Sequence, residues 1–236
     1  MYIENPKTKN SGIICCIPQT STCPNHCDDC FYASGRSYLE PLKENLPNIP
    51  PLELTENRIV RINDGNDSSN ERELVESVAR TFENYFFNTA VPEKIEEFSG
   101  PVVLTVNPGD MTEKSFHRVS PAPYNLMFVR VRVSVWNLDT VVTPAVEYYT
   151  TRGVPVVLTY MAYSHQLDRP YFQSYYEWKT RTLNEYWVLN QMGQRLIEDR
   201  FLANLLVYSC GGKLQKSCRY CGNCMREYFV TKQRML

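Results

Sequence analysis

The chain has 236 residues, a formal net charge of −1 at pH 7 and a pI near 6.3. This length suits one α/β domain with a small appendage and a large core. The near-neutral charge gives no general attraction for phosphate backbones or anionic membranes, so neither a nucleic-acid nor a membrane partner is favoured. No apolar run reaches the roughly 18 residues of a membrane span. Residues 1–10 lack a signal-peptide core, and we therefore expect a cytoplasmic protein.

Repeated apolar and β-branched runs along the chain indicate a parallel sheet. Six such runs end in polar or turn residues and predict strands over residues 12–17, 58–63, 101–106, 126–136, 154–160 and 202–208. Apolar residues at helical spacing predict helices over residues 71–87, 140–151 and 180–200. Strands that alternate with helices imply right-handed βαβ units, whose chemistry lies at the carboxyl ends of the strands.

Nine cysteines in a reducing compartment indicate metal ligands more readily than disulfides. Cys15 and Cys16 lie in the first predicted strand and are expected in the core. The other seven form two clusters. The first is the N-terminal thiol set, in C-x3-C-x2-C spacing, made of Cys23, Cys27 and Cys30.

The number of thiols in this first cluster is informative. Four thiolates close a structural zinc site, whereas three thiolates on a cubane iron–sulfur cluster leave one iron open to a non-protein ligand. The alternative is half of a zinc site that His26 or a remote cysteine completes. The x3 spacing is less typical of zinc, so we favour the iron–sulfur interpretation.

This spacing, with the strand and helix order that follows, resembles the radical S-adenosylmethionine (SAM) superfamily over about residues 12–209. The resemblance implies an α/β fold of the (β/α)6 partial TIM barrel type, although an open doubly wound sheet has the same element order. It implies that the N-terminal thiol set holds a catalytic [4Fe-4S] cluster whose fourth iron binds SAM. One electron from a donor such as flavodoxin or ferredoxin then cleaves SAM to a 5′-deoxyadenosyl radical, which abstracts hydrogen from substrate.

The resemblance also suggests which residues contact SAM. The family's second strand ends in Gly-Gly-Glu, and the matching place here is the cofactor-binding candidate Asp64, Gly65, Asn66 and Asp67, which could also be only a turn. The family commonly places an aromatic residue before the last cysteine. Here that residue is Asp29, and Phe31 follows the motif instead. Ser134 and Asn137 fall where the family has polar groups on the ribose or carboxylate of SAM.

Strand alternation predicts which side chains face this site. Arg130, Arg132 and Ser134 share one face of the fourth predicted strand, while Val129, Val131 and Val133 share the face that helices should cover. The same alternation adds polar residues from the other strands, namely Arg61, Asn63, Thr105, Asn107 and Thr159. We interpret this face as a wet, partly cationic lumen in which Arg132 and Thr159 contact SAM and the arginines favour an anionic substrate. The alternative is an ordinary solvent-facing side of the sheet.

The second cluster, in C-x7-C-x2-C-x2-C spacing, provides four thiols and is called the C-terminal thiol set: Cys210, Cys218, Cys221 and Cys224. It makes residues 210–236 a metal-binding tail after a domain of residues 1–209. Residues 210–226 resemble the zinc loop of 7-cyano-7-deazaguanine synthases. We favour zinc here, and a second iron–sulfur cluster is the alternative.

These features predict a radical SAM enzyme that acts on a small-molecule, nucleotide or peptide substrate. Two other functions remain open. One is a zinc-stabilised module that grips single-stranded nucleic acid with the aromatic residues of 160–178, which could equally stack a planar substrate or serve as packing. The other is an activase that generates a radical on a partner protein. His117 and His165 are isolated, and no phosphate loop, nucleophile elbow or H-E-x-x-H helix occurs.

Overall fold

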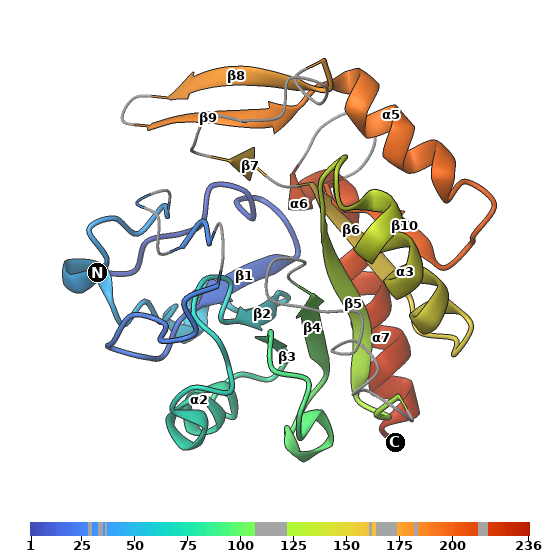
Figure 1. Ribbon diagram of the computed structural model, residues 1–236. Helices are drawn as coiled ribbons and strands as arrows, with labels where there is room; N and C mark the ends of the chain where they lie inside the picture. The colour runs from blue at the N-terminus through green and yellow to red at the C-terminus, as the bar shows by residue number, and fades with distance from the viewer. Residues whose placement is uncertain are drawn as a thin grey trace.

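A single curled sheet of parallel strands organises the protein (Figure 1). The computed structural model describes residues 1–27, 30–32, 35, 37–106, 122–160, 162–163, 174–181, 184–211 and 217–236. Asp29, Asn107, His117 and His165 lie outside these residues. The sheet has seven strands in the order β1 (Ile13–Cys16), β2 (Ile59–Ile62), β3 (Tyr85–Thr89), β4 (Val102–Val106), β5 (Leu126–Val133), β6 (Val156–Tyr160) and β10 (Val207–Ser209). The expected α/β half-barrel is therefore confirmed, with seven strands in place of six.

The additional strand is β3, which the sequence had predicted to be the end of a helix over residues 71–87. The helix α2 covers only Arg72–Ala79, and β3 pairs in parallel with β2 and β4. Phe86 and Phe87 point to opposite faces and both are fully buried. A strand buried on both faces is continuously apolar, so its residues also fit a helical spacing.

The helix predicted over residues 180–200 is also wrong in its first half. The chain there forms the antiparallel hairpin β8 (Tyr176–Arg181) and β9 (Asn184–Leu189), and only α5 (Gln191–Arg200) is helical. The hairpin forms a small second sheet with β7 (Ala162–Tyr163), which follows β6 closely in the chain. This sheet therefore lies beyond the carboxyl edge of the large sheet, at the top of Figure 1.

Helices cover the outer face of the curled sheet. The outward side chains of β5, Val129, Val131 and Val133, are fully buried against this layer, which confirms the predicted alternation. The predicted helix over residues 140–151 is present as a π-helical turn that leads into α3. The covering elements are α2, the 3-10 turn η2 (Ile95–Glu97), the π-helix η4 (Leu138–Val142), α3 (Thr143–Thr150) and α5.

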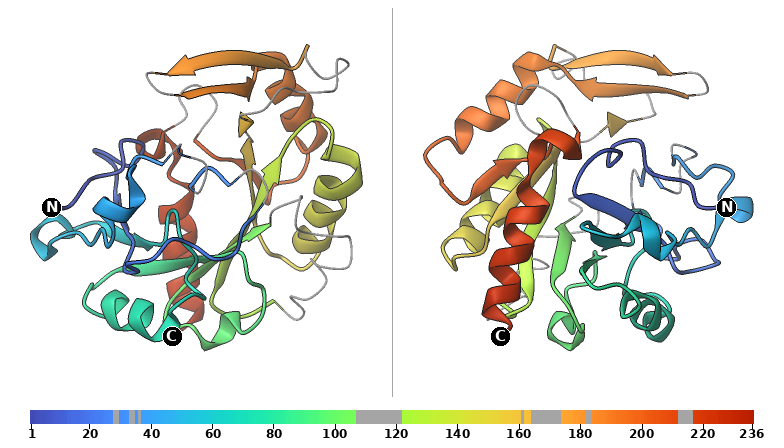
Figure 2. Two further views of the ribbon diagram at one scale, coloured as in Figure 1. Left: turned by 60° about the vertical axis from the view of Figure 1, so that its left-hand side comes forward. Right: turned by 180° about the vertical axis from the view of Figure 1, so that it is seen from behind.

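The C-terminal helix packs on the inner face of the same sheet. After the short α6 (Cys218–Cys221), α7 (Asn223–Arg234) runs along β5 from the carboxyl edge toward the amino edge (Figure 2). Tyr228 is 1% exposed and packs against inward residues of the strands: Ile13, Ile59, Phe86, Val103, Met127, Phe128 and Val157. Residues 217–236 thus contribute to the core.

The connection between β1 and β2 is largely irregular, as its prolines predict. Residues 41–54 of this connection are fully described, and there the helical pieces are α1 (Leu42–Asn45) and the 3-10 turn η1 (Leu52–Leu54). Among the described residues, no helix is long and apolar enough to cross a membrane.

Candidate functional site

The N-terminal thiol set lies on the loop that leaves the carboxyl end of β1. Two contacts fix the start of this loop to the segment after β2, because the Gln19 side-chain amide donates to the carbonyl oxygens of Asp67 (3.0 Å) and Asn70 (2.9 Å). The Asn70 amide also donates to the Cys23 sulfur at 3.5 Å. The loop is therefore positioned at the carboxyl edge, where a parallel sheet places its chemistry.

The three thiols are half-buried and share one short segment. Burial raises the pKa of Cys23, and the nearby Asp67 and Cys30 also raise it. The amide of Cys30 donates to the carbonyl of Cys27 at 3.2 Å, which turns the chain between the last two cysteines. Among the described residues, however, no three acid, histidine or cysteine side chains are close enough together to hold a metal ion. Metal binding would thus require the thiols to be drawn together.

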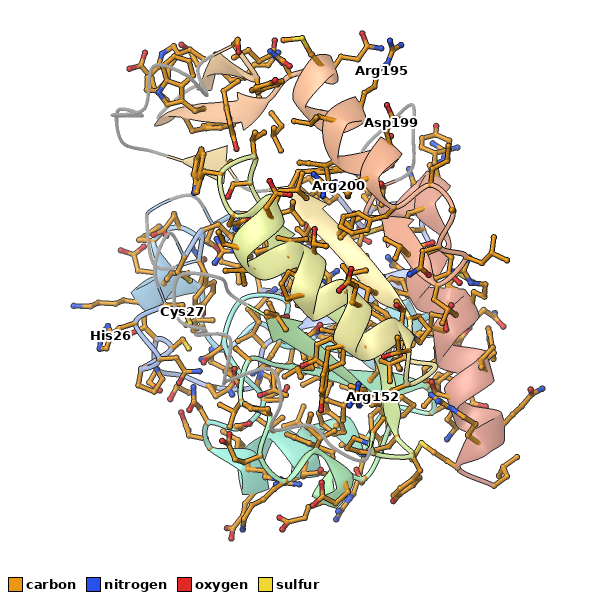
Figure 3. All side chains as sticks on the ribbon, turned by 45° about the vertical axis from the view of Figure 1, so that its right-hand side comes forward. His26, Cys27, Arg152, Arg195, Asp199 and Arg200 are labelled. Carbon is orange, nitrogen blue, oxygen red and sulfur yellow. The ribbon has the colours of Figure 1, made fainter. Side chains whose placement is uncertain are left out.

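His26 does not complete a zinc site in this arrangement. Its side chain is exposed and points away from the body of the protein beside Cys27 (Figure 3).

The turn after β2, predicted to bind SAM, uses its carboxylates within the protein. Asp67 is 4% exposed and accepts hydrogen bonds from the amides of Ser69 (2.8 Å) and Ala90 (2.7 Å) and from the Thr89 hydroxyl (2.7 Å). The Asp64 carboxylate accepts from Asn5 at 2.6 Å and Tyr38 at 3.3 Å. These contacts fit a structural turn as well as a cofactor site.

The neutral residues of the turn have different surroundings. The side-chain oxygen of Asn66 accepts from the Asp67 amide at 2.9 Å, and its amide donates to the Ser21 carbonyl at 3.0 Å. Gly65 lies flat against the ring of Tyr32, so that a β-carbon would overlap with the ring. Tyr32 is 2% exposed, whereas Phe31, the aromatic residue predicted to contact SAM, is 49% exposed. The buried aromatic residue beside the thiols is therefore Tyr32.

The predicted SAM contacts at the ends of β5 and β6 lie at the same edge of the sheet. Arg132 and Thr159 are paired across β5 and β6. Asn137 closes the end of β5, since its side-chain oxygen accepts from the amide of Ser134 at 2.9 Å and its amide contacts the carbonyl of Arg132 at 3.5 Å. Ser134 is fully buried.

Buried polar atoms without a hydrogen-bond partner gather at this edge. Within the described part of the chain, seven of the eleven such atoms belong to Gln19, Tyr32, Asn63, Ser68, Ser134 and Thr159, toward this edge, and the other four belong to Arg58, Arg61, Arg72 and Asn125 elsewhere. Buried polar groups are nearly always paired, so several unpaired ones at one edge indicate a ligand site. Gln19, Tyr32 and Ser68 were missed from the sequence. Their position just beyond β1 and β2 was the available signal.

The strand register places the predicted lumen residues on one inner face. Thr105 of β4 pairs with Arg130 of β5, and Arg130 pairs with Val157 of β6. Val157 in turn pairs with Tyr208 of β10. On β2, Arg61 pairs with Cys15 of β1, and its guanidinium lies 3.3 Å from that sulfur and 3.4 Å from Asp64. The inner face thus has an apolar half covered by α7 and a polar half toward the carboxyl edge.

The C-terminal thiol set lies beside this polar half. A hydrogen bond with the Cys221 thiol, together with burial, raises the pKa of Cys210, and the guanidinium of Arg130 opposes that shift. Burial raises the pKa of Cys224, and the guanidiniums of Arg130 and Arg61 lower it in part. The tail that the sequence predicted to bind metal therefore approaches the same interior as the arginines.

The aromatic segment of residues 160–178 is described only in part, because residues 161 and 164–173 lie outside the described ranges. Tyr176 is 5% exposed, stacks on Trp136 with ring centroids 5.3 Å apart, and accepts a hydrogen bond from the Val135 amide. At this residue the segment serves as packing.

No protein-family model matches the chain, and no curated protein or solved structure matches it at a significant level.

Proposed function

We propose that the protein is a cytosolic radical SAM enzyme whose N-terminal thiol set binds a [4Fe-4S] cluster. The observation that carries the proposal is the position of a three-thiol loop at the carboxyl edge of a curled parallel sheet, next to buried polar atoms that lack partners. Three thiols fit such a cluster by donor type, since they leave one iron for SAM. A reduced cluster with bound SAM supplies reductive cleavage of SAM and hydrogen-atom abstraction.

The chain's own residues have three roles in this proposal. The thiols bind the cluster, with Gln19 and Asn70 holding their loop in place. The unpaired hydroxyls of Ser134 and Thr159 offer hydrogen bonds to SAM. The small sheet β7–β9–β8 lies beyond the edge and helps to exclude water and oxygen. An external protein of the flavodoxin or ferredoxin type provides the electron, and Arg132 favours an anionic substrate.

Anaerobic reconstitution with iron and sulfide tests the proposal. The wild-type protein should bind about four irons per chain, show a reduced-cluster EPR signal that SAM perturbs, and release 5′-deoxyadenosine after reduction. A variant in which Cys23, Cys27 and Cys30 are all replaced by alanine should lose all three properties. The matched control, Cys218→Ser with Cys221→Ser, removes two thiols elsewhere and should retain the SAM-dependent signal. Deoxyadenosine release by the triple variant would refute the proposal.

Thr159→Val tests the role of an unpaired hydroxyl at the edge. Because the substitution is isosteric and removes a hydroxyl with no partner, we expect an unchanged or slightly higher free energy of unfolding, together with weaker SAM binding. The matched control is Thr89→Val at the end of β3, whose hydroxyl donates to Asp67 at 2.7 Å. It should lower the free energy of unfolding by about 1.5–3 kcal/mol. Urea unfolding and titration of the EPR signal with SAM measure the two effects. A Thr159→Val variant with wild-type SAM affinity would remove this residue from the cofactor site.

A further inference from the structure

The C-terminal thiol set faces the interior of the sheet. Cys210 comes two residues after Tyr208, so strand alternation continues the inner face, and its amide donates to the Leu158 carbonyl at 2.9 Å. Cys224 precedes Tyr228 by one turn of α7, which places both on the same side of the helix. Cys210 and Cys224 both pack against the inner apolar cluster.

The local backbone brings the parts of this set together. Gly211 and Gly222 each follow a cysteine directly and have φ of 90° and 68°, a left-handed conformation that lets the chain reverse beside a sulfur. The amide of Gly211 donates to the Cys221 sulfur at 3.3 Å. The side-chain amide of Asn223 donates to the Ser209 carbonyl at 3.1 Å and joins the start of α7 to the end of β10.

Two half-buried cations lie near these sulfurs. The side chain of Arg61 is 13% exposed; burial lowers its pKa, while Cys15 and Asp64, and after them Cys218 and Cys224, raise it. Arg130 donates to the neutral amide of Asn88 at 3.1 Å, and within the described residues it forms no ion pair with a carboxylate. Arg61 is paired with the Asp64 carboxylate at 3.4 Å, whereas the described residues offer Arg130 no carboxylate, and neutral thiols supply no opposite charge to it.

We infer that the C-terminal thiol set binds one zinc ion at the inner face of the sheet, with Arg61 and Arg130 as its counter-ions. Zinc with four thiolates carries a net charge of about −2, which Arg130 and the Asp64-paired Arg61 balance in part. Binding converts four thiols to thiolates, releases their four protons and draws the sulfurs together, because within the described residues no three such groups already lie close enough to hold a metal ion. The two arginines then belong to the metal centre, and anionic substrate recognition falls to Arg132.

Metal analysis separates this inference from the proposed function. In the variant that lacks the N-terminal thiol set, purified without added iron, we expect about one zinc per chain. In Cys218→Ser with Cys221→Ser, the zinc should be lost. Cobalt substituted for zinc should give the intense sulfur-to-metal charge-transfer bands of a tetrathiolate site. The inference would be overturned if the first variant contained iron and sulfide in place of zinc, or if it contained no zinc. Neither result would bear on the N-terminal cluster, because this variant lacks the N-terminal thiols.

The counter-ion role is tested by removing the charges. Arg61→Met with Arg130→Met should weaken zinc binding by about 10–100-fold in competition with a chromophoric chelator, as loss of groups that support metal ligands does. Arg61→Lys with Arg130→Lys, which keeps both charges, should recover most of the affinity. The control is Arg152→Met with Arg200→Met, which removes two charges from the outer surface (Figure 3) and should leave affinity unchanged. Equal losses in the methionine and lysine variants would show that charge is not the contribution.

Discussion

Tyr228→Ala is expected to lower the free energy of unfolding by about 3–5 kcal/mol. The ring is 1% exposed and belongs to an apolar cluster with inward residues of six strands, and its hydroxyl donates to the Asn84 side chain at 3.2 Å. Truncation would leave a cavity between α7 and the sheet that the rigid strands cannot fill. Urea unfolding followed by tryptophan fluorescence and by circular dichroism measures the change.

The adjacent Phe229 provides the control. It lies on the same helix and its ring contacts that of Tyr228, but it is 55% exposed. Phe229→Ala should therefore cost about 1 kcal/mol or less. Similar losses in the two variants would mean that α7 is not docked through the Tyr228 face, and the position of the C-terminal thiols would lose its support.

Asp67→Ala is expected to have an effect of similar size, about 3–5 kcal/mol. Its carboxylate accepts three hydrogen bonds at 2.7–2.8 Å from the segments after β2 and β3. Hydrogen bonds to a charged group are worth about 1.5–3 kcal/mol each, and they are not additive within one network. Because the Asp67 carbonyl also holds Gln19, the variant should loosen the thiol loop and weaken the effect of SAM on the cluster.

Glu73→Ala is the matched control for this charge. Glu73 lies in the first turn of α2 and is exposed, so its loss should change the free energy of unfolding by about 0.5 kcal/mol or less. Thermal and urea unfolding of both variants give the comparison. A stable Asp67→Ala protein would show that the turn does not depend on this carboxylate and would reopen Asp67 as a cofactor ligand.

The sheet could be predicted because β-branched runs and strand alternation are local signals. The two faces of β5 were predicted correctly from the alternation of Val129 and Val131 with Arg130 and Arg132. The strand β3 could not be predicted, since an aromatic run that is buried on both sides fits the apolar spacing of a helix as well as that of a strand. The hairpin of β8 and β9 was also missed, because its charged residues occur at spacings that a helix allows.

The candidate site was predictable in position and much less in detail. The thiol spacing and the strand before it placed the first cluster at the carboxyl edge. The sequence could not show that the Asp67 carboxylate accepts hydrogen bonds from the Thr89 hydroxyl and the Ala90 amide at the end of β3, since those contacts depend on tertiary packing. It also could not show that Arg61 and Arg130 face the C-terminal sulfurs, because these residues are far apart in the chain.

The inner position of α7 determines when the fold can be completed during synthesis. Ile13 of β1 belongs to the same inner cluster as Tyr228, and Met225 of α7 packs against Gly12 just before β1. The apolar inner surface of the earlier strands therefore stays uncovered until α7 has been synthesised and can pack against it. Contacts this distant in sequence form slowly, and exposed strands favour association during that time. The nascent chain should thus be prone to association until α7 is available to cover this surface.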